Sequence, residues 1–214
     1  MIRECNLEDI SDGKRYTSAD LVKVGCNDCE GCHACCTGMG DTICLDPYDV
    51  CRLSFGTNRP FASFLEKEVG LHVEEGVIIP HLLMGDGEAC SFLNGEGRCS
   101  IHPWRPGICR LFPLGRVYED EGFSYFLQAD ECVKTNRTKE KIKNWLDTPE
   151  LKRYEAFILT WHNHIKEVQH TLQNGADAQK INMEHLQLFY LMPYASPEAF
   201  YEEFETRLAQ WNSK

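Results

Sequence analysis

The chain has 214 residues, of which 43% are hydrophobic and 26% are charged, so it can bury a core without cysteine cross-links. Its net charge of −11 argues against a nucleic-acid binder, because such proteins neutralise phosphates with Lys and Arg. We also expect no membrane span, since no apolar run approaches the roughly 20 residues that a spanning helix needs.

The 12 cysteines make the cellular compartment important for the interpretation. Residues 1–8 are polar and acidic and do not resemble a secretion signal. We therefore expect a cytoplasmic protein, in which thiols stay reduced and clustered cysteines are more often metal ligands than disulfides. A secreted disulfide scaffold is the less favoured alternative.

Cysteine content divides the chain near residue 138. Eleven of the 12 cysteines lie within residues 26–132, and residues 139–214 contain none. We predict a metal-binding domain over residues 1–138 and a helical segment over residues 139–214 that packs on it. The expected fold class is α+β, with short strands and irregular loops around the metal.

Turn and cap residues predict short elements in the first part. Asp46-Pro47-Tyr48-Asp49 combines an N-cap, a proline and an acid, which indicates the start of a helix. A second helix is expected from Arg59-Pro60-Phe61 through Glu68, ended by Gly70. The expected strands are residues 77–84, confined to an edge by Pro80, and a hairpin of residues 114–118 and 123–128.

The last part of the chain is predicted to form three helices. The first follows Thr148-Pro149-Glu150 and has the 3.6-residue apolar period of one buried face. Its apolar positions are Leu151, Tyr154, Phe157, Ile158, Trp161, Ile165, Val168 and Leu172. Asn174-Gly175 ends it, and further helices are expected over residues 178–191 and after Ser196-Pro197-Glu198. His162 and His164, two apart on the first helix, face differently and are not expected to share a metal.

The strongest chemical signal is the string Cys26-x2-Cys29-x2-Cys32-x2-Cys35-Cys36. Two-residue gaps let the chain turn so that neighbouring sulfurs face one metal, as in zinc and iron–sulfur sites. Adjacent side chains such as Cys35 and Cys36 tend to point apart. They could serve two centres or different atoms of one cluster, or form an inert buried pair. His33, inside this loop, could adjust the site by hydrogen bonding.

A second group of cysteines is more widely spaced. Cys90, Cys99, Cys109 and Cys132 would supply a further set of four ligands if the fold brings them together. His102 follows Cys99 at ligand spacing, although a hydrogen-bonding loop histidine is the alternative. Arg105 and Arg110 flank Cys109 and would offset thiolate charge, or else form ordinary ion pairs.

The remaining cysteines carry weaker signals. Cys26 is ambiguous, because the string holds enough thiols without it. Cys51 falls within a predicted helix and reads as a small buried hydrophobe, and Cys44 could be the same or a less certain ligand. The pattern assigns no role to Cys5.

The combined motif resembles the YkgJ-like cysteine-cluster family, a zinc- or iron-chelating domain with a Cys-x2-Cys-x2-Cys-Cys signature. The resemblance is carried by Cys29 to Cys36, Cys99-Ser100-Ile101-His102, Arg105-Pro106, Cys109-Arg110 and Phe112-Pro113, and covers roughly residues 25–135. It implies a ligand set of Cys29, Cys32, Cys35, Cys36, Cys90, Cys99, Cys109 and Cys132. The extra Cys26, Cys44 and Cys51, and His102 where a tyrosine is expected, leave open an enlarged or additional metal site.

Three functions remain open from the sequence. The favoured one is an iron–sulfur protein with a redox or cofactor role, whose eight thiolates could hold two clusters. The alternative is a zinc-binding module, structural or metal-handling, because soft sulfur ligands suit both metals. The domain is also shared with flagellin lysine N-methylases, which suggests a protein-modifying enzyme, but no glycine-rich loop for a methyl donor is found. A protein redox partner or protein substrate is expected; the oligomeric state is left open.

Overall fold

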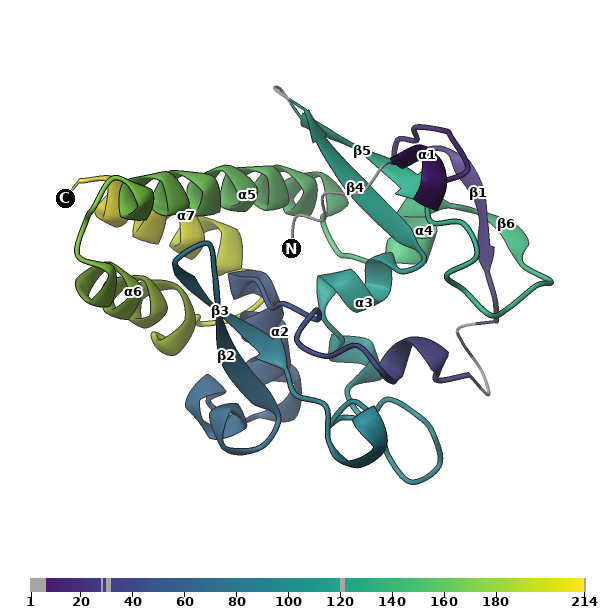
Figure 1. The fold of residues 1–214 in the computed structure, drawn as a ribbon, viewed down its shortest axis with the longest axis horizontal. Coiled ribbons are helices and arrows are strands. Elements are labelled where there is room, and N and C mark those ends of the chain that lie inside the picture. Colours follow the sequence, from purple (N-terminus) through teal and green to yellow (C-terminus); the bar gives the residue numbers. More distant parts are fainter. Residues whose placement is uncertain (1–6, 28, 30–31, 120–121, 214) are drawn as a thin grey trace.

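The fold combines short helices with three two-stranded antiparallel sheets in the computed structural model, which describes residues 7–27, 29, 32–119 and 122–213. The predicted α+β class is confirmed. Figure 1 shows the long helix α5 (Leu151–Gln173), with α6 (Ala178–Leu186) and α7 (Phe200–Asn212) beside its C-terminal part. The β4–β5 hairpin lies near the N-terminal end of α5. No helix among the described residues has the length and apolarity that a membrane crossing requires.

Each sheet is one antiparallel pair of strands. The pairs are β1 (Leu21–Gly25) with β6 (Thr138–Lys141), β2 (Val69–Glu74) with β3 (Val77–Leu82), and β4 (Leu114–Glu119) with β5 (Gly122–Leu127). The predicted strand around Pro80 and the predicted hairpin are therefore confirmed. The β1–β6 pair was not predicted, because its strands are far apart in sequence and β6 is entirely polar.

The helix expected over residues 59–68 is wrong in extent. A 3-10 helix covers Phe61–Glu66 only. Strand β2 begins at Val69, so Gly70 lies within a strand and does not end a helix. The sequence from Val69 alternates between residues that point to opposite faces, and pairing with β3 favours this extended form over another helical turn.

The predicted start of α2 (Pro47–Thr57) is confirmed by a complete capping box. Asp46 Oδ1 accepts from the Asp49 backbone N–H at 2.8 Å, and Asp49 Oδ2 accepts from the Asp46 N–H at 3.3 Å. Pro47 has no N–H and therefore needs no acceptor at this position, which suits the first turn of a helix. The remaining short helices are α1 (Leu7–Ile10), α3 (Gly107–Leu111) and α4 (Ile142–Leu146), with 3-10 turns at Ala34–Cys36, Asp86–Glu88 and His102–Trp104.

The main core joins residues from both sides of position 138. The ring of Tyr48, on α2, lies 5.5 Å from that of Tyr154 on α5 and 4.9 Å from that of Phe200 on α7, measured between centroids. All three side chains are buried. Truncating one such aromatic residue costs about 3–5 kcal/mol, so α2 is held firmly against the C-terminal helices.

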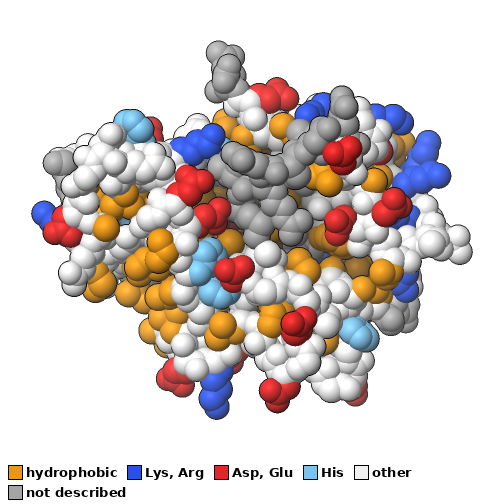
Figure 2. Space-filling view, viewed as in Figure 1, with side chains coloured by type: hydrophobic (Ala, Val, Ile, Leu, Met, Phe, Trp, Pro, Cys, Tyr) orange, Lys and Arg blue, Asp and Glu red, His pale blue; other side chains and the backbone are white. Residues whose placement is uncertain are grey.

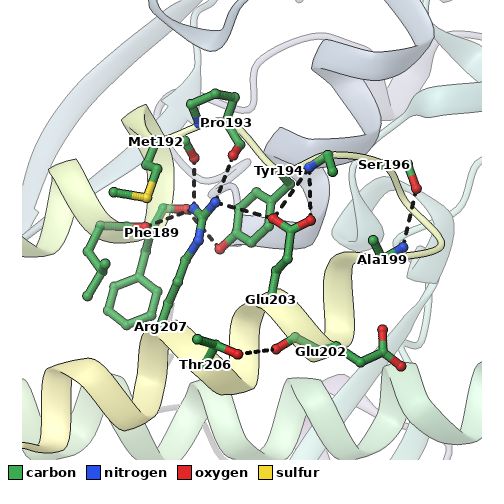
Figure 3. Close-up of polar contacts among 12 residues, drawn as sticks. Phe189, Met192, Pro193, Tyr194, Ser196, Ala199, Glu202, Glu203, Thr206 and Arg207 are labelled. Carbon is green, nitrogen blue, oxygen red and sulfur yellow. Dashed lines mark hydrogen bonds and ion pairs between the residues drawn. The ribbon is translucent and has the colours of Figure 1, made fainter.

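The second C-terminal helix ends differently from the prediction. It was expected to run to Leu191, but residues Gln187–Leu191 form a π-helical turn. Figure 3 shows why this end is stable: Arg207, from α7, points into the turn. Its guanidinium donates to the carbonyls of Met192 and Pro193, both at 2.7 Å, and lies 3.7 Å from the Tyr194 ring centroid.

Candidate metal centre

The first cysteine segment leaves the sheet at the end of β1. Gly25 is needed there because a Cβ would collide with the side chain of Thr138 on β6. The chain then turns so that the Sγ atoms of Cys26 and Cys29 lie 3.5 Å apart. Cys29 has a φ of 58°, and its carbonyl accepts from the N–H of Cys32 at 2.9 Å. The turn therefore directs several thiols to one side.

Five cysteines line one pocket on this side of the molecule. They are Cys26, Cys29, Cys32, Cys35 and, from a segment about a hundred residues later in the chain, Cys132. The rest of the wall includes Phe112, Pro113 and Trp145. The indole N–H of Trp145 donates to the Phe112 carbonyl at 3.1 Å, which holds this apolar wall together. Phe112 and Pro113 belong to the motif that carries the family resemblance, whereas the sequence gave no signal for Trp145 as part of this wall.

A second set of cysteines is attached to the first through the backbone. The N–H of Cys90 donates to the carbonyl of Cys36 at 2.8 Å, next to an isolated antiparallel bridge between Thr37 and Ala89. Cys99 is placed by a further bridge with Leu93. These pairings bring Cys90 and Cys99 to the 3-10 turn that carries Cys35 and Cys36.

Helix α2 positions the segment that carries Cys109 through two hydrogen bonds. Arg52 donates to the carbonyl of Pro103 at 2.7 Å, and the N–H of Gly107 donates to Asp49 Oδ1 at 2.7 Å. Gly107 is needed because a Cβ would collide with the hydroxyl of Tyr154. Helix α3, which begins at Gly107, carries Cys109.

Cys35 lies at the centre of the combined cluster. It is within electrostatic range of Cys29 in the first set and of Cys90, Cys99 and Cys109 in the second. The two sets of cysteines therefore adjoin each other around Cys35 and Cys36.

Burial raises the pKa of several of these thiols and so favours their protonated form. It raises the pKa of Cys29 to about 12, with the neighbouring Cys26 adding to the effect. The hydrogen bond with Cys36, and then burial, raises the pKa of Cys35, and burial raises those of Cys90, Cys99 and Cys109. A metal that binds here must displace protons, as thiolate ligation always requires.

Arg105 lies near several of the sulfurs, and Arg98 donates to the carbonyl of Cys29 at 3.1 Å. Arg105 is within electrostatic range of Cys29, Cys35 and Cys99, and it favours their thiolate forms. Its guanidinium also contacts the ring of His102, with Nη1 2.6 Å from Nε2. The structure thus places His102 against Arg105, within the 3-10 turn that follows Cys99. Arg110 is buried, and it lies near Asp49 and under Tyr154.

Cysteines outside the cluster have other surroundings. Cys51 is 4% exposed within α2 and packs in the main core, as predicted. Cys44 lies beside β3 and groups with His72 and Glu74 of β2, two residues that sequence reasoning missed because β2 itself was not predicted. Cys5 lies outside the described residues. None of the eleven described cysteines forms a disulfide.

His162 and His164 of α5 both lie against other rings. His162 stacks on Tyr118 with ring centroids 3.6 Å apart, and His164 is buried next to His185. His33 lies against Gly97, close to the cluster loop.

The spacing of the sulfurs limits what the cluster can hold without rearrangement. Four thiolates around one zinc ion, each at about 2.3 Å, lie about 3.8 Å from one another. Among the described residues, no three sulfurs of the cluster lie within 4.8 Å of one another. The Cys26–Cys29 pair comes close to the single-ion spacing, and Cys35 and Cys36 form a side-chain hydrogen bond with each other. A polynuclear centre, whose ligands bind different metal atoms, requires wider spacing.

Comparison with known proteins identifies the family. Searches of curated proteins and of solved structures found no match for this chain. A family model matches residues 28–148, more than half of the chain, and contains the cysteine segments that surround Cys35. The chain belongs to the CxxCxxCC family, described as a putative zinc- or iron-chelating domain.

Proposed function

We propose that the cysteine cluster holds an iron–sulfur cofactor with a redox or cofactor role. The observation that carries this proposal is that five cysteines line one pocket, yet no three described sulfurs of the cluster lie within 4.8 Å of one another, as the ligands of one tetrahedral ion would. In a [4Fe–4S] cluster each of the four cysteines binds a different iron, so the sulfurs lie farther apart than around a single ion.

The surroundings of the cysteines support the same proposal. The apolar wall of Phe112, Pro113 and Trp145 would limit water access, which is one of the factors that set cluster potentials. Arg105 would offset part of the negative charge of a thiolate-bound cluster. The absence of disulfides among the described cysteines fits a reducing compartment such as the cytoplasm.

The number of thiols allows two clusters. One would use sulfurs from the pocket lined by Cys26, Cys29, Cys32, Cys35 and Cys132. The other would use Cys36, Cys90, Cys99 and Cys109. Their proximity at Cys35 would favour electron transfer between them and on to a protein partner. On this account residues 1–138 form the metal domain and the C-terminal helices support it through α2.

Zinc is the second candidate, and one observation favours it. The Sγ atoms of Cys26 and Cys29, 3.5 Å apart, are near the edge length of a tetrahedral zinc–thiolate site. Cys32 and Cys132, which line the same pocket, would then supply the other two ligands of a closed structural site.

Metal and sulfide analysis of the full chain, purified without oxygen, tests the proposal. Iron with a matching amount of acid-labile sulfide and a brown visible spectrum that bleaches on reduction is the expected result. Colourless protein with zinc and no sulfide would overturn the iron–sulfur proposal and favour the zinc module.

A further inference from the structure

A second group of metal-binding side chains lies on the β2–β3 hairpin. One ligand atom each from Cys44, His72 and Glu74 lie within 4.8 Å of one another. His72 Nε2 is 3.7 Å from Glu74 Oε2. Figure 2 shows histidine side chains beside acidic ones near the middle of this face, in the region of the hairpin.

Strand β2 turns His72 and Glu74 toward the protein and Leu71 and Val73 toward water. Leu71 and Val73 are 46% and 65% exposed, whereas His72 and Glu74 are on the opposite, partly buried face of β2. A shift of one residue in the pairing would reverse this arrangement and bury the two apolar side chains. Such a departure from the usual pattern is expected at functional positions.

Backbone pairing on both sides of β3 brings the three side chains together. Cys44 forms an antiparallel bridge with His81, supported by hydrogen bonds from Leu45 to Pro80 and from Leu82 to Ile43. His72 lies diagonally opposite His81 on the neighbouring strand β2. Cys44 and His72 therefore approach β3 from opposite edges.

His81 holds the ring of His72 in place. The Nδ1 atoms of the two histidines are hydrogen-bonded at 3.0 Å, so Nε2 of His72 is the atom directed to Glu74. Gly70 makes room for this contact, because a Cβ there would lie 2.8 Å from Cε1 of His81. Metal-binding histidines commonly have their second nitrogen held in this way.

We propose that Cys44 Sγ, His72 Nε2 and the Glu74 carboxylate bind a divalent zinc-class ion, with His81 as a positioning residue. Sulfur, imidazole and carboxylate together suit zinc rather than an iron–sulfur cluster. Ligands of a zinc ion lie about 3.3–3.8 Å apart, so closing the site requires movements on the order of 1 Å. Three protein ligands leave a fourth position for water or another ligand, as in open zinc sites. The site is separate from the cysteine cluster and does not depend on which metal that cluster holds.

Cobalt binding to the full chain with its cysteine cluster already loaded tests this proposal. We expect one further equivalent of Co²⁺ to bind, with the absorption of a tetrahedral ion and a cysteine-to-cobalt charge-transfer band. Cys44→Ser should remove that band, and Glu74→Gln should weaken Co²⁺ binding at least tenfold. His81→Gln should weaken it by about 10- to 100-fold, the usual effect of losing a residue that orients a ligand.

Matched controls come from the same residue types outside the site. Cys51→Ser, the exposed His170→Ala and Glu75→Gln, next to Glu74, should bind the extra cobalt as the unchanged protein does. Equal cobalt binding by unchanged protein, Cys44→Ser and Glu74→Gln would overturn the proposal. Loss of the main cofactor in folded Cys44→Ser would also overturn it, since Cys44 would then belong to the cysteine cluster. Circular dichroism identifies a misfolded variant, and Glu74→Gln then decides the outcome.

Discussion

The backbone N–H of Cys90 donates to the carbonyl oxygen of Cys36 at 2.8 Å. This hydrogen bond joins the local cysteine string to a loop from much later in the chain. It keeps the Cys36 side chain near Cys90 without using either sulfur, so both sulfurs remain available to a metal. The metal centre is thus built by backbone pairing between segments, and not by the Cys-x2-Cys spacing alone.

Replacing a central cysteine should remove the metal. We expect Cys35→Ser and Cys32→Ser to lose most of the bound metal and much of the stability, because metal binding to such a site is folding free energy. Metal content by elemental analysis and thermal unfolding by circular dichroism measure both effects.

Cys51→Ala is the matched control for these variants. Cys51 is buried in α2 and packs against apolar side chains, so its loss should cost only about 1 kcal/mol and leave the metal content unchanged. Equal metal content in Cys35→Ser, Cys32→Ser and Cys51→Ala would refute the assignment of the cluster.

Asp49 should connect the stability of α2 with metal retention. It is 3% exposed, and it accepts from the N–H of Gly107, at the start of the helix that carries Cys109. Asp49→Ala leaves that donor and the nearby buried Arg110 uncompensated, so we expect a loss of about 2–4 kcal/mol and faster release of metal to a chelator. Asp49→Asn keeps an acceptor oxygen and should lose less. Chelator release rates for the two variants that do not differ from the unchanged protein would contradict this link.

Arg207 should be a strong determinant of the C-terminal helices. Its buried guanidinium satisfies carbonyls at the end of the π-helical turn, including those of Met192 and Pro193. Arg207→Met removes these donors, and we expect a loss of about 2–4 kcal/mol in urea unfolding. Arg153→Met is the control, since its ion pairs with Glu150 and Glu202 are exposed and should contribute far less. A smaller effect for Arg207 than for Arg153 would show that the capping contacts do not stabilise the turn.

The stacked pair of His164 and His185 should make the protein sensitive to acid. Their ring centroids are 5.3 Å apart, and no ring nitrogen of either has a hydrogen-bond partner among the described residues. Burial lowers the pKa of His164 to about 4, and burial with the neighbouring His164 lowers the pKa of His185 to about 3.

The direction of the pH effect follows from these shifts. An unfolded histidine has a pKa of about 6.5, so the unfolded state binds more protons below that pH. The stability that these neutral histidines contribute to the folded state is therefore fully present above a pH of about 6.5 and is lost as the pH falls toward 4. The slope approaches about 1.4 kcal/mol per pH unit for each histidine. A His164→Leu, His185→Leu double variant should show a smaller loss of stability between pH 7 and pH 5, and an unchanged slope would contradict the prediction.

Local signals predicted the elements that depend on neighbouring residues. The capping box of Asp46 and Asp49 and the apolar period from Leu151 each act within a few residues, and both elements formed as expected. The β1–β6 pair depends on contact between distant segments, and the polar residues from Thr138 to Lys141 give no strand pattern. For the same reason, local spacing identified the cysteine string from Cys26 to Cys36 but could not predict that Cys132 lies in the same pocket.

X-ray absorption at the metal edge, on full chain purified without oxygen, tests the central claim most directly. An iron–sulfur centre predicts an iron edge, a shell of sulfur neighbours and a second shell from neighbouring iron atoms. A zinc edge with one shell of sulfur at about 2.3 Å, and no metal neighbour, would contradict it and identify a mononuclear thiolate site.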